Sequence, residues 1–223
     1  MSEPKRLYQQ IADQLRNLIQ TVPYPPGTRL PAERELAQTL GVSRPSLREA
    51  LIALEIEGTI EIRMGSGIYA LSTGKTAQMS RSLGESPMEL MQARAVIESA
   101  VIVQVAAVIG PESLRALRAI LDAMDQEIVN GRKPIEQDRQ FHLTLAGQAG
   151  NLVLQDIVAT LFDERHSPMS DHMRGRFETP ESWRAAYHEH ERILACLESR
   201  NPLGAQAAMH QHLVASGRRW LEG

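Results

Sequence analysis

The sequence has little of what would place it in several large protein classes. It contains one cysteine, Cys196, so an internal disulfide framework is excluded, which fits a reducing cytoplasm. It has no run of about 18 uncharged apolar residues, so we expect no transmembrane helix. The polar N-terminus MSEPKRLYQQ lacks the apolar core of a secretory signal. We therefore expect a cytoplasmic protein that is not attached to a membrane.

The sequence also lacks the strong positive charge of many nucleic-acid-binding proteins. Its formal net charge is −3, with +1 in residues 1–75 and −4 in residues 76–223. Non-specific affinity for DNA should therefore be modest, and specific binding should depend on a few well-placed arginines. Charge permits DNA binding here but does not indicate it.

Residues 30–67 contain the element order of a helix-turn-helix with a β-wing. An amphipathic helix over about 6–21 precedes them. The stretch itself predicts a helix over 32–40, a tight turn at Gly41, a helix capped by Ser43, and strands over 60–63 and 68–71. In proteins with this order of elements, the second helix of the helix-turn-helix lies in the major groove of DNA.

The remainder of the chain predicts an all-helical bundle, so the fold as a whole is mainly α. We expect a winged helix-turn-helix domain over 1–72, a linker over 73–86 and a helical domain over 87–223. The helical domain should hold six or so helices, at about 87–109, 112–130, 134–149, 152–165, 180–199 and 202–221. Residues 166–179 are rich in charge and poor in periodicity, which predicts a loop or irregular segment.

Several arginines in the first domain are placed to contact DNA. Arg44 and Arg48 are four residues apart, so they share one face near the start of the reading helix. An arginine that binds guanine O6 and N7 contributes about 1–3 kcal/mol of discrimination. Arg34 can reach a phosphate, and the glycines of the wing, Gly65 and Gly67, allow a close approach to the minor groove. The alternative is that the arginines pair with neighbouring acidic residues, namely Glu33, Glu35 or Glu49.

One carboxylate and three imidazoles in the helical domain follow apolar helical stripes. Asp138 and His142 are four apart on one predicted helix, while His190 and His212 each lie on a later one. Converging inside a bundle, they would suit Zn²⁺, Ni²⁺ or Mn²⁺. The alternative is a set of hydrogen-bonded core histidines. His188 and His210 are rival ligands, each two residues away and so on another side of its helix.

Arg94 lies in line with apolar residues of the predicted helix over 87–109, which is a poor place for an unpaired guanidinium. It is either the partner of Glu98, four residues later, or a fork that receives the carboxylate of an organic acid.

The first domain resembles the winged helix-turn-helix of the GntR superfamily of bacterial transcription regulators. LPAERELA, GVSRPSLREAL and the wing GSG carry the resemblance. It implies that Arg34, Arg44, Arg48 and Gly65 contact DNA, and we add Ser43, Ser46 and Gly67 to the predicted contact set. A lysine or threonine is often found in the family where Pro45 and Ser46 stand, so the base preference should differ.

The second domain resembles the FCD effector domain of the FadR-type subfamily. ELMQARAVIESAV, DRQFHLTLAGQAGN, HEHERILACLE and AQAAMHQHL carry this resemblance. It implies that Asp138, His142, His190 and His212 hold a divalent metal, with Zn²⁺ expected first, and that Arg94 lies near the effector. Within the subfamily, PKRLYQQIADQL, LEIEGTIEIRMGSGIY and PMELMQARAVIES are most similar to regulators of hexuronate and sugar-acid catabolism.

Together these features predict a homodimeric transcription regulator, a repressor, and not an enzyme. It should bind a palindromic operator in double-stranded DNA and sense a small carboxylate or sugar acid through a metal and an arginine. Two alternatives stay open. In one the metal is purely structural; in the other the Asp/His₃ site is that of a DNA-binding metallohydrolase.

Overall fold

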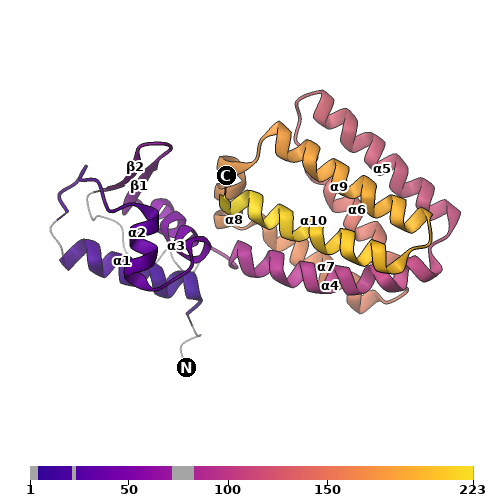
Figure 1. The fold of residues 1–223 in the computed structure, drawn as a ribbon, viewed down its shortest axis with the longest axis horizontal. Coiled ribbons are helices and arrows are strands. Elements are labelled where there is room, and N and C mark those ends of the chain that lie inside the picture. Colours follow the sequence, from indigo (N-terminus) through magenta and orange to yellow (C-terminus); the bar gives the residue numbers. More distant parts are fainter. Residues whose placement is uncertain (1–4, 22–23, 72–82, 223) are drawn as a thin grey trace. The chain divides into compact units, whose positions relative to one another are not determined.

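The structure, a computed structural model, describes residues 5–21, 24–71 and 83–222 (Figure 1). The chain forms two compact units. The first comprises residues 1–88 together with 166–173, and the second comprises 89–165 and 174–223. Of the linker predicted over 73–86, residues 73–82 lie outside the described residues; Leu83 and Ser86 are buried.

The first unit is a three-helix core with a β-hairpin. Its helices are α1 (Leu7–Thr21), α2 (Glu33–Leu40) and α3 (Arg44–Ile56), and α3 packs against both α1 and α2. α1 buries Tyr8, Ile11, Leu15 and Ile19, at the spacing of one helix face. These side chains share one apolar core with Leu47, Leu51 and Leu54 of α3.

Turn and cap residues fix the helix-turn-helix. Gly41 ends α2 in the left-handed conformation with φ of 66°, which glycine adopts without strain. Ser43 then caps α3, because its side chain accepts a hydrogen bond from the backbone N–H of Ser46. The hairpin follows as β1 (Ile60–Arg63) and β2 (Gly67–Ala70), antiparallel with Ile60 opposite Ala70. The predicted motif is therefore present, with shifts of one residue at its ends.

The second unit is all helical. It is built from α4 (Pro87–Val108), α5 (Pro111–Val129), α6 (Ile135–Gly147), α7 (Leu152–Asp163), the 3₁₀ turn η2 (Glu164–His166), α8 (Pro168–Phe177), α9 (Pro180–Glu198) and α10 (Pro202–Glu222), with the first residues of α4 and α8 counted in the first unit. α9 packs against α5 and α10, and α6 packs against α5 and α7. Phe141, Leu145, Ile193 and Leu197 are among its fully buried side chains.

The prediction of an irregular segment over 166–179 is wrong, because most of these residues form α8. Its buried residues are Met169, Ser170, Met173 and Arg174, which do follow helical spacing. Two of the four are polar, so they produce no apolar stripe in the sequence. The described part of the chain after Pro87 therefore holds seven α-helices rather than six.

Within the described residues, α4 is the one helix long and apolar enough to cross a membrane by length and composition. Half of its most apolar 18-residue window is buried inside the protein. It also carries Arg94 and Glu98, both buried and joined by an ion pair. These features are those of a core helix of a globular bundle.

Candidate metal centre and DNA-reading surface

Four predicted metal ligands from three helices meet at one point of the second unit. Asp138 and His142 lie one turn apart on α6, His190 lies on α9, and His212 lies on α10. One ligand atom from each lies within 4.8 Å of the others. His190 Nε2 is 3.3 Å from Asp138 Oδ1 and 3.2 Å from His142 Nε2. Ligand atoms on a tetrahedron with bonds of about 2.05 Å are separated by roughly 3.3 Å, which these two distances match.

The hydrogen bonds of the imidazoles direct lone pairs toward the centre of this cluster. His142 Nδ1 lies 2.5 Å from Glu98 Oε2, and His212 Nδ1 lies 2.8 Å from Glu189 Oε2. A carboxylate accepts a proton-bearing nitrogen, which leaves Nε2 of each ring as the lone-pair donor. Three imidazoles and a carboxylate of this kind can hold a divalent metal.

The pKa values of the ligands reflect their burial and close approach. Burial and the neighbouring His212 lower the pKa of His190 well below its usual range. Burial also lowers the pKa of His212. Burial alone would lower the pKa of His142, but Glu98 and Asp138 raise it above its usual value. These lowered pKa values favour the neutral form of His190 and His212, which is the form that binds metal.

Each of two ligand histidines is held by a carboxylate that an arginine holds in turn. Arg94 Nε donates to Glu98 Oε1 at 2.6 Å. Arg219 forms two hydrogen bonds with Glu189, at 2.7 and 2.9 Å. Such outer partners orient metal ligands and raise their basicity. Helical spacing indicated Glu98 only as a partner for Arg94. Arg219 and Glu189 lie 30 residues apart, so no spacing pattern indicates their pairing.

A cavity opens beside the cluster. Asp138, His190 and His212 belong to its wall, and three arginines line it with them: Arg165, Arg174 and Arg219. The indole rings of Trp183 and Trp220 also line it. Arg165 donates to Asp138 Oδ2 at 3.0 Å, while burial and the charge of Arg94 lower the pKa of Arg165 to about 10.

Arg94 does not line this cavity in the described part of the chain. Its side chain is 1% exposed and pairs with Glu98, which is the alternative that its spacing allowed. It acts on the cluster through Glu98 and His142. The sequence did not single out Arg165 or Arg174, because they lie in or beside the stretch expected to be irregular.

The rival histidines lie away from the cluster. His188 is 62% exposed at its side chain and contacts Glu191, and His210 is exposed on α10. Residues two apart point to different sides of an α-helix, and the exposure of His188 and His210 agrees with that expectation.

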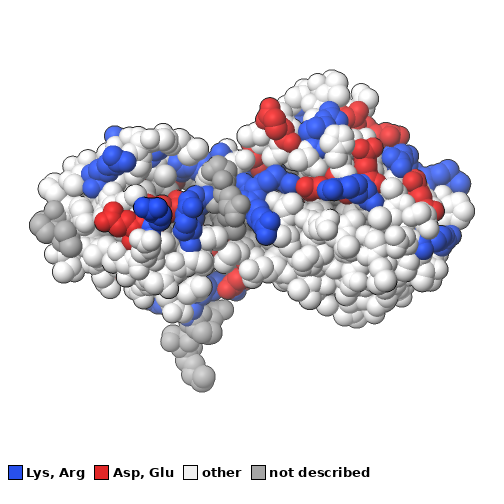
Figure 2. Space-filling view, viewed as in Figure 1, with Lys and Arg blue, Asp and Glu red and all other residues white. Residues whose placement is uncertain are grey.

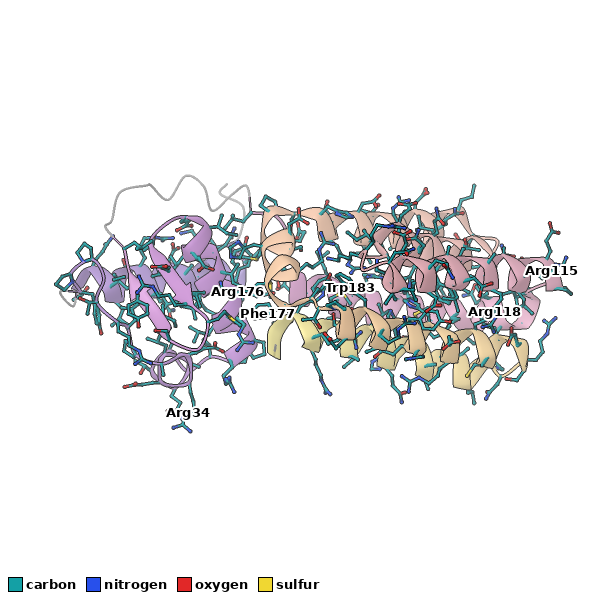
Figure 3. The ribbon with its side chains drawn as sticks, turned by 90° about the horizontal axis from the view of Figure 1, so that it is seen from above. Arg34, Arg115, Arg118, Arg176, Phe177 and Trp183 are labelled. Atoms are coloured by element: carbon teal, nitrogen blue, oxygen red, sulfur yellow. The ribbon has the colours of Figure 1, made fainter. Side chains whose placement is uncertain are left out.

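The predicted DNA-contacting residues lie on α2, α3 and the wing. Arg34 points away from the first unit into solvent (Figure 3), and the Arg44 side chain is 63% exposed. Arg48 is mostly buried and forms hydrogen bonds of 3.0–3.3 Å with Glu33. Ser46 is buried, and its hydroxyl lies 2.8 Å from that of Ser43. The two serines thus have a structural role at the start of α3.

The wing glycines differ in what they require. Gly65 has φ of 70° and open space around it, so its backbone is accessible. Gly67 has φ of 127°, and a Cβ there would lie 2.7 Å from Arg29 Nε. Its φ therefore favours glycine, whereas the end of the Arg29 side chain could move away from an added Cβ.

Comparison with known proteins gives the family of both units. Residues 7–70 match the model of the bacterial regulatory proteins of the gntR family, and residues 89–215 match the FCD domain. The chain belongs to the GntR family, with an FCD domain as its second unit. It is therefore a DNA-binding transcription regulator.

Individual relatives cover nearly the whole chain. The Exu regulon transcriptional regulator of Escherichia coli (strain K12) is 36% identical over 96% of this chain and 84% of that protein. The Uxu operon transcriptional regulator of the same strain is 33% identical over 98% and 88%. The structure of a GntR protein from Streptococcus agalactiae has 25% identity and a TM-score of 0.51, covering 95% of this chain and 99% of that one.

The GntR-family assignment decides one of the alternatives. The similar chains are transcription regulators, so the DNA-binding metallohydrolase is set aside and the chain is not an enzyme. All four clustered ligands fall within the matched FCD residues, whereas Arg219 lies beyond their end.

Proposed function

We propose that this GntR-family protein is a homodimeric repressor of hexuronate or related sugar-acid catabolism, acting in the cytoplasm and released from its operator by a sugar acid. The names of the Exu and Uxu regulators support the effector class. The observation that carries the proposal is the cavity, because its wall includes both three of the clustered ligands and three arginines. A carboxylate can meet metal and guanidinium there together.

The metal is proposed to be Zn²⁺, with Ni²⁺ or Mn²⁺ as alternatives, held by Asp138, His142, His190 and His212. A bound metal would supply a Lewis-acidic point for an effector oxygen. Structural zinc sites are closed by protein, whereas this set faces a cavity. The cavity therefore favours a sensing role over a purely structural one. The direct effector contact predicted for Arg94 stays a prediction, and Arg165 is the better-placed guanidinium.

For DNA, we propose that Arg44 and Arg48 read base edges, that Arg34 binds a phosphate, and that the backbone at Gly65 approaches the minor groove. Ser43 and Ser46 would fix the start of α3, and the N–H groups there can meet a phosphate. Two copies related by a two-fold axis then require a palindromic operator.

One experiment tests the sensing function against a structural metal. Operator DNA selected from a random library would be bound to the metal-loaded protein and titrated with D-galacturonate and D-glucuronate, with fluorescence anisotropy as the readout. We expect release by at least one of the two acids. After chelation the fold should persist by circular dichroism while release is lost. Unfolding on chelation would instead support a structural metal, and no response to either acid would contradict the effector class.

The outer face of α4 supports the proposed dimer. Beyond Glu89, the exposed residues of this helix carry no charge, and they include Val96 at 69% and Val108 at 66% exposure. Figure 2 shows few charged residues along the lower edge of the second unit, where α4 runs in Figure 1. An uncharged strip of this length is typical of an interaction surface.

Val96→Glu is therefore expected to convert the dimer into a monomer, because a carboxylate would lose its water in the interface. Light scattering after size exclusion would measure the mass. Val129→Glu, at the end of α5 and 66% exposed, is the matched control and should leave the mass unchanged. A dimer in both variants would place the interface elsewhere.

A further inference from the structure

Among the described residues, the carboxylates that contact the clustered ligands or line the cavity each have a cationic partner from the protein. These ion pairs are Asp138 with Arg165, Glu98 with Arg94, Glu189 with Arg219, and Glu178 with Lys133. Asp138, Glu178 and their two partners line the cavity, as does Arg219. The carboxylates that hold the histidines are thus neutralised within the second unit.

The pair of Asp138 with Arg165 matters most, because Asp138 is the only anion in the proposed ligand set. In a site of one carboxylate and three neutral imidazoles, the carboxylate cancels one of the two charges of a divalent metal. Here the Arg165 guanidinium, 3.0 Å from Asp138 Oδ2 and 8% exposed at its side chain, cancels that carboxylate. The ligand set taken together with Arg165 is then neutral, so a bound metal keeps both positive charges.

Two unbalanced charges in a partly buried site are costly unless an incoming ligand neutralises them. We infer that this site binds a sugar acid with a second anionic group, a carboxylate or a phosphate, more tightly than the corresponding singly charged acid. The inference rests on the proposed sensing function and specifies its ligand class. The cavity beside the cluster offers further polar groups to such an acid. Ser182 and Ser216 line it and can bind hydroxyl groups, and Arg174 adds another guanidinium to the wall.

A matched series of open-chain acids tests this charge preference. Isothermal titration calorimetry on the full-length zinc-loaded dimer would compare D-gluconate with D-glucarate and 6-phosphogluconate. The last two add, respectively, a carboxylate and a phosphate at the far end of the same chain. We expect at least one of them to bind about tenfold or more tightly than gluconate. If only glucarate binds more tightly than gluconate, the preferred ligand is a dicarboxylate. If only 6-phosphogluconate does, the preferred ligand is a phosphorylated acid.

The opposite outcomes separate this inference from the function on which it rests. D-glucuronate or gluconate binding as tightly as both glucarate and 6-phosphogluconate would overturn the charge preference and leave sugar-acid sensing intact. Proton release would be measured in buffers of different ionisation enthalpy. If a singly charged acid releases one proton when it binds, one of its hydroxyl groups supplies the second negative charge. That result would also overturn the inference. Binding of none of the four acids would contradict the proposed function itself.

Substitution of Arg165 provides a second test with its own control. Arg165→Gln restores the unbalanced charge of Asp138, so the preference for the doubly charged acid should shrink about tenfold or reverse. Arg165→Lys keeps the charge and should keep the preference. Arg118→Gln removes an exposed arginine paired with Glu198 and should change nothing. The ratio of two affinities within one variant is the readout, since a general loss of stability would lower both. An unchanged ratio in Arg165→Gln would overturn the role given to Arg165.

Discussion

Replacing His142 with alanine is expected to abolish stoichiometric metal binding and, with it, the response of the DNA complex to a sugar acid. His142 is fully buried and shares the centre of the cluster with His190 and Asp138. Loss of an outer hydrogen-bond partner alone costs about 10- to 100-fold in metal affinity. Removing a direct ligand should cost at least about a hundredfold. Metal content would be measured by mass spectrometry after dialysis against a weak chelator.

His188→Ala is the matched control, because it removes an exposed histidine of the same unit and should leave metal content unchanged. His142 also forms a hydrogen bond with the buried Glu98, so its removal can destabilise the fold. His212→Ala therefore provides a second ligand variant in case His142→Ala folds poorly. Full metal occupancy in both ligand variants would contradict the proposed set. Loss of metal in His188→Ala or His210→Ala would identify a rival histidine as a ligand.

Replacing Arg44 with alanine is expected to remove operator-specific binding while the dimer survives. The Arg44 side chain is 63% exposed, and its nearest acidic atom, Glu33 Oε1, lies 3.7 Å from its Nε. It is therefore available to a base edge at little cost. One arginine–guanine contact contributes about 1–3 kcal/mol, and two distant half-sites add to about 2–6 kcal/mol. The affinity for the operator should fall by roughly 30-fold to 10⁴-fold.

The comparison with non-specific DNA makes this test specific. Anisotropy titrations with operator and scrambled DNA should show that Arg44→Ala loses the difference between them. Binding to scrambled DNA should fall only slightly, with a shallower salt dependence. Arg118→Ala, in the FCD domain, should leave both affinities unchanged. An intact preference for the operator in Arg44→Ala would refute its base-reading role.

The parts of the fold that the sequence predicted depend on local rules. Ser43 and Gly41 mark the ends of α3 and α2 through capping and left-handed backbone, which need only neighbouring residues. Asp138 and His142 could be paired because four residues make one helical turn. Their meeting with His190 and His212 depends on how α6, α9 and α10 pack. Apolar periodicity indicated the inward faces, and the resemblance to the FCD domain indicated the meeting point.

The features that the sequence did not predict depend on contacts between distant segments. α8 was missed because Ser170 and Arg174 occupy buried positions where apolar residues are expected. Arg165 and Arg219 find their carboxylates 27 and 30 residues away, so no helical spacing reveals them. For Arg94 the local rule did give the observed partner, Glu98, four residues away.

The hydrogen bonds between Arg48 and Glu33 have a consequence for how the protein finds its operator. If Arg48 reads base edges as proposed, a phosphate of non-specific DNA would have to compete with a carboxylate already bound to this guanidinium, so this contact would add little to non-specific binding. A guanine that offers two acceptors can replace Glu33 without leaving the guanidinium unsatisfied. Because a genome offers about 10⁶–10⁹ competing sites, brief stays at wrong ones shorten the search. In the proposed role of Arg48 as a base reader, Glu33 would therefore keep stays on non-specific DNA short and would give up the guanidinium only to a base that offers two acceptors.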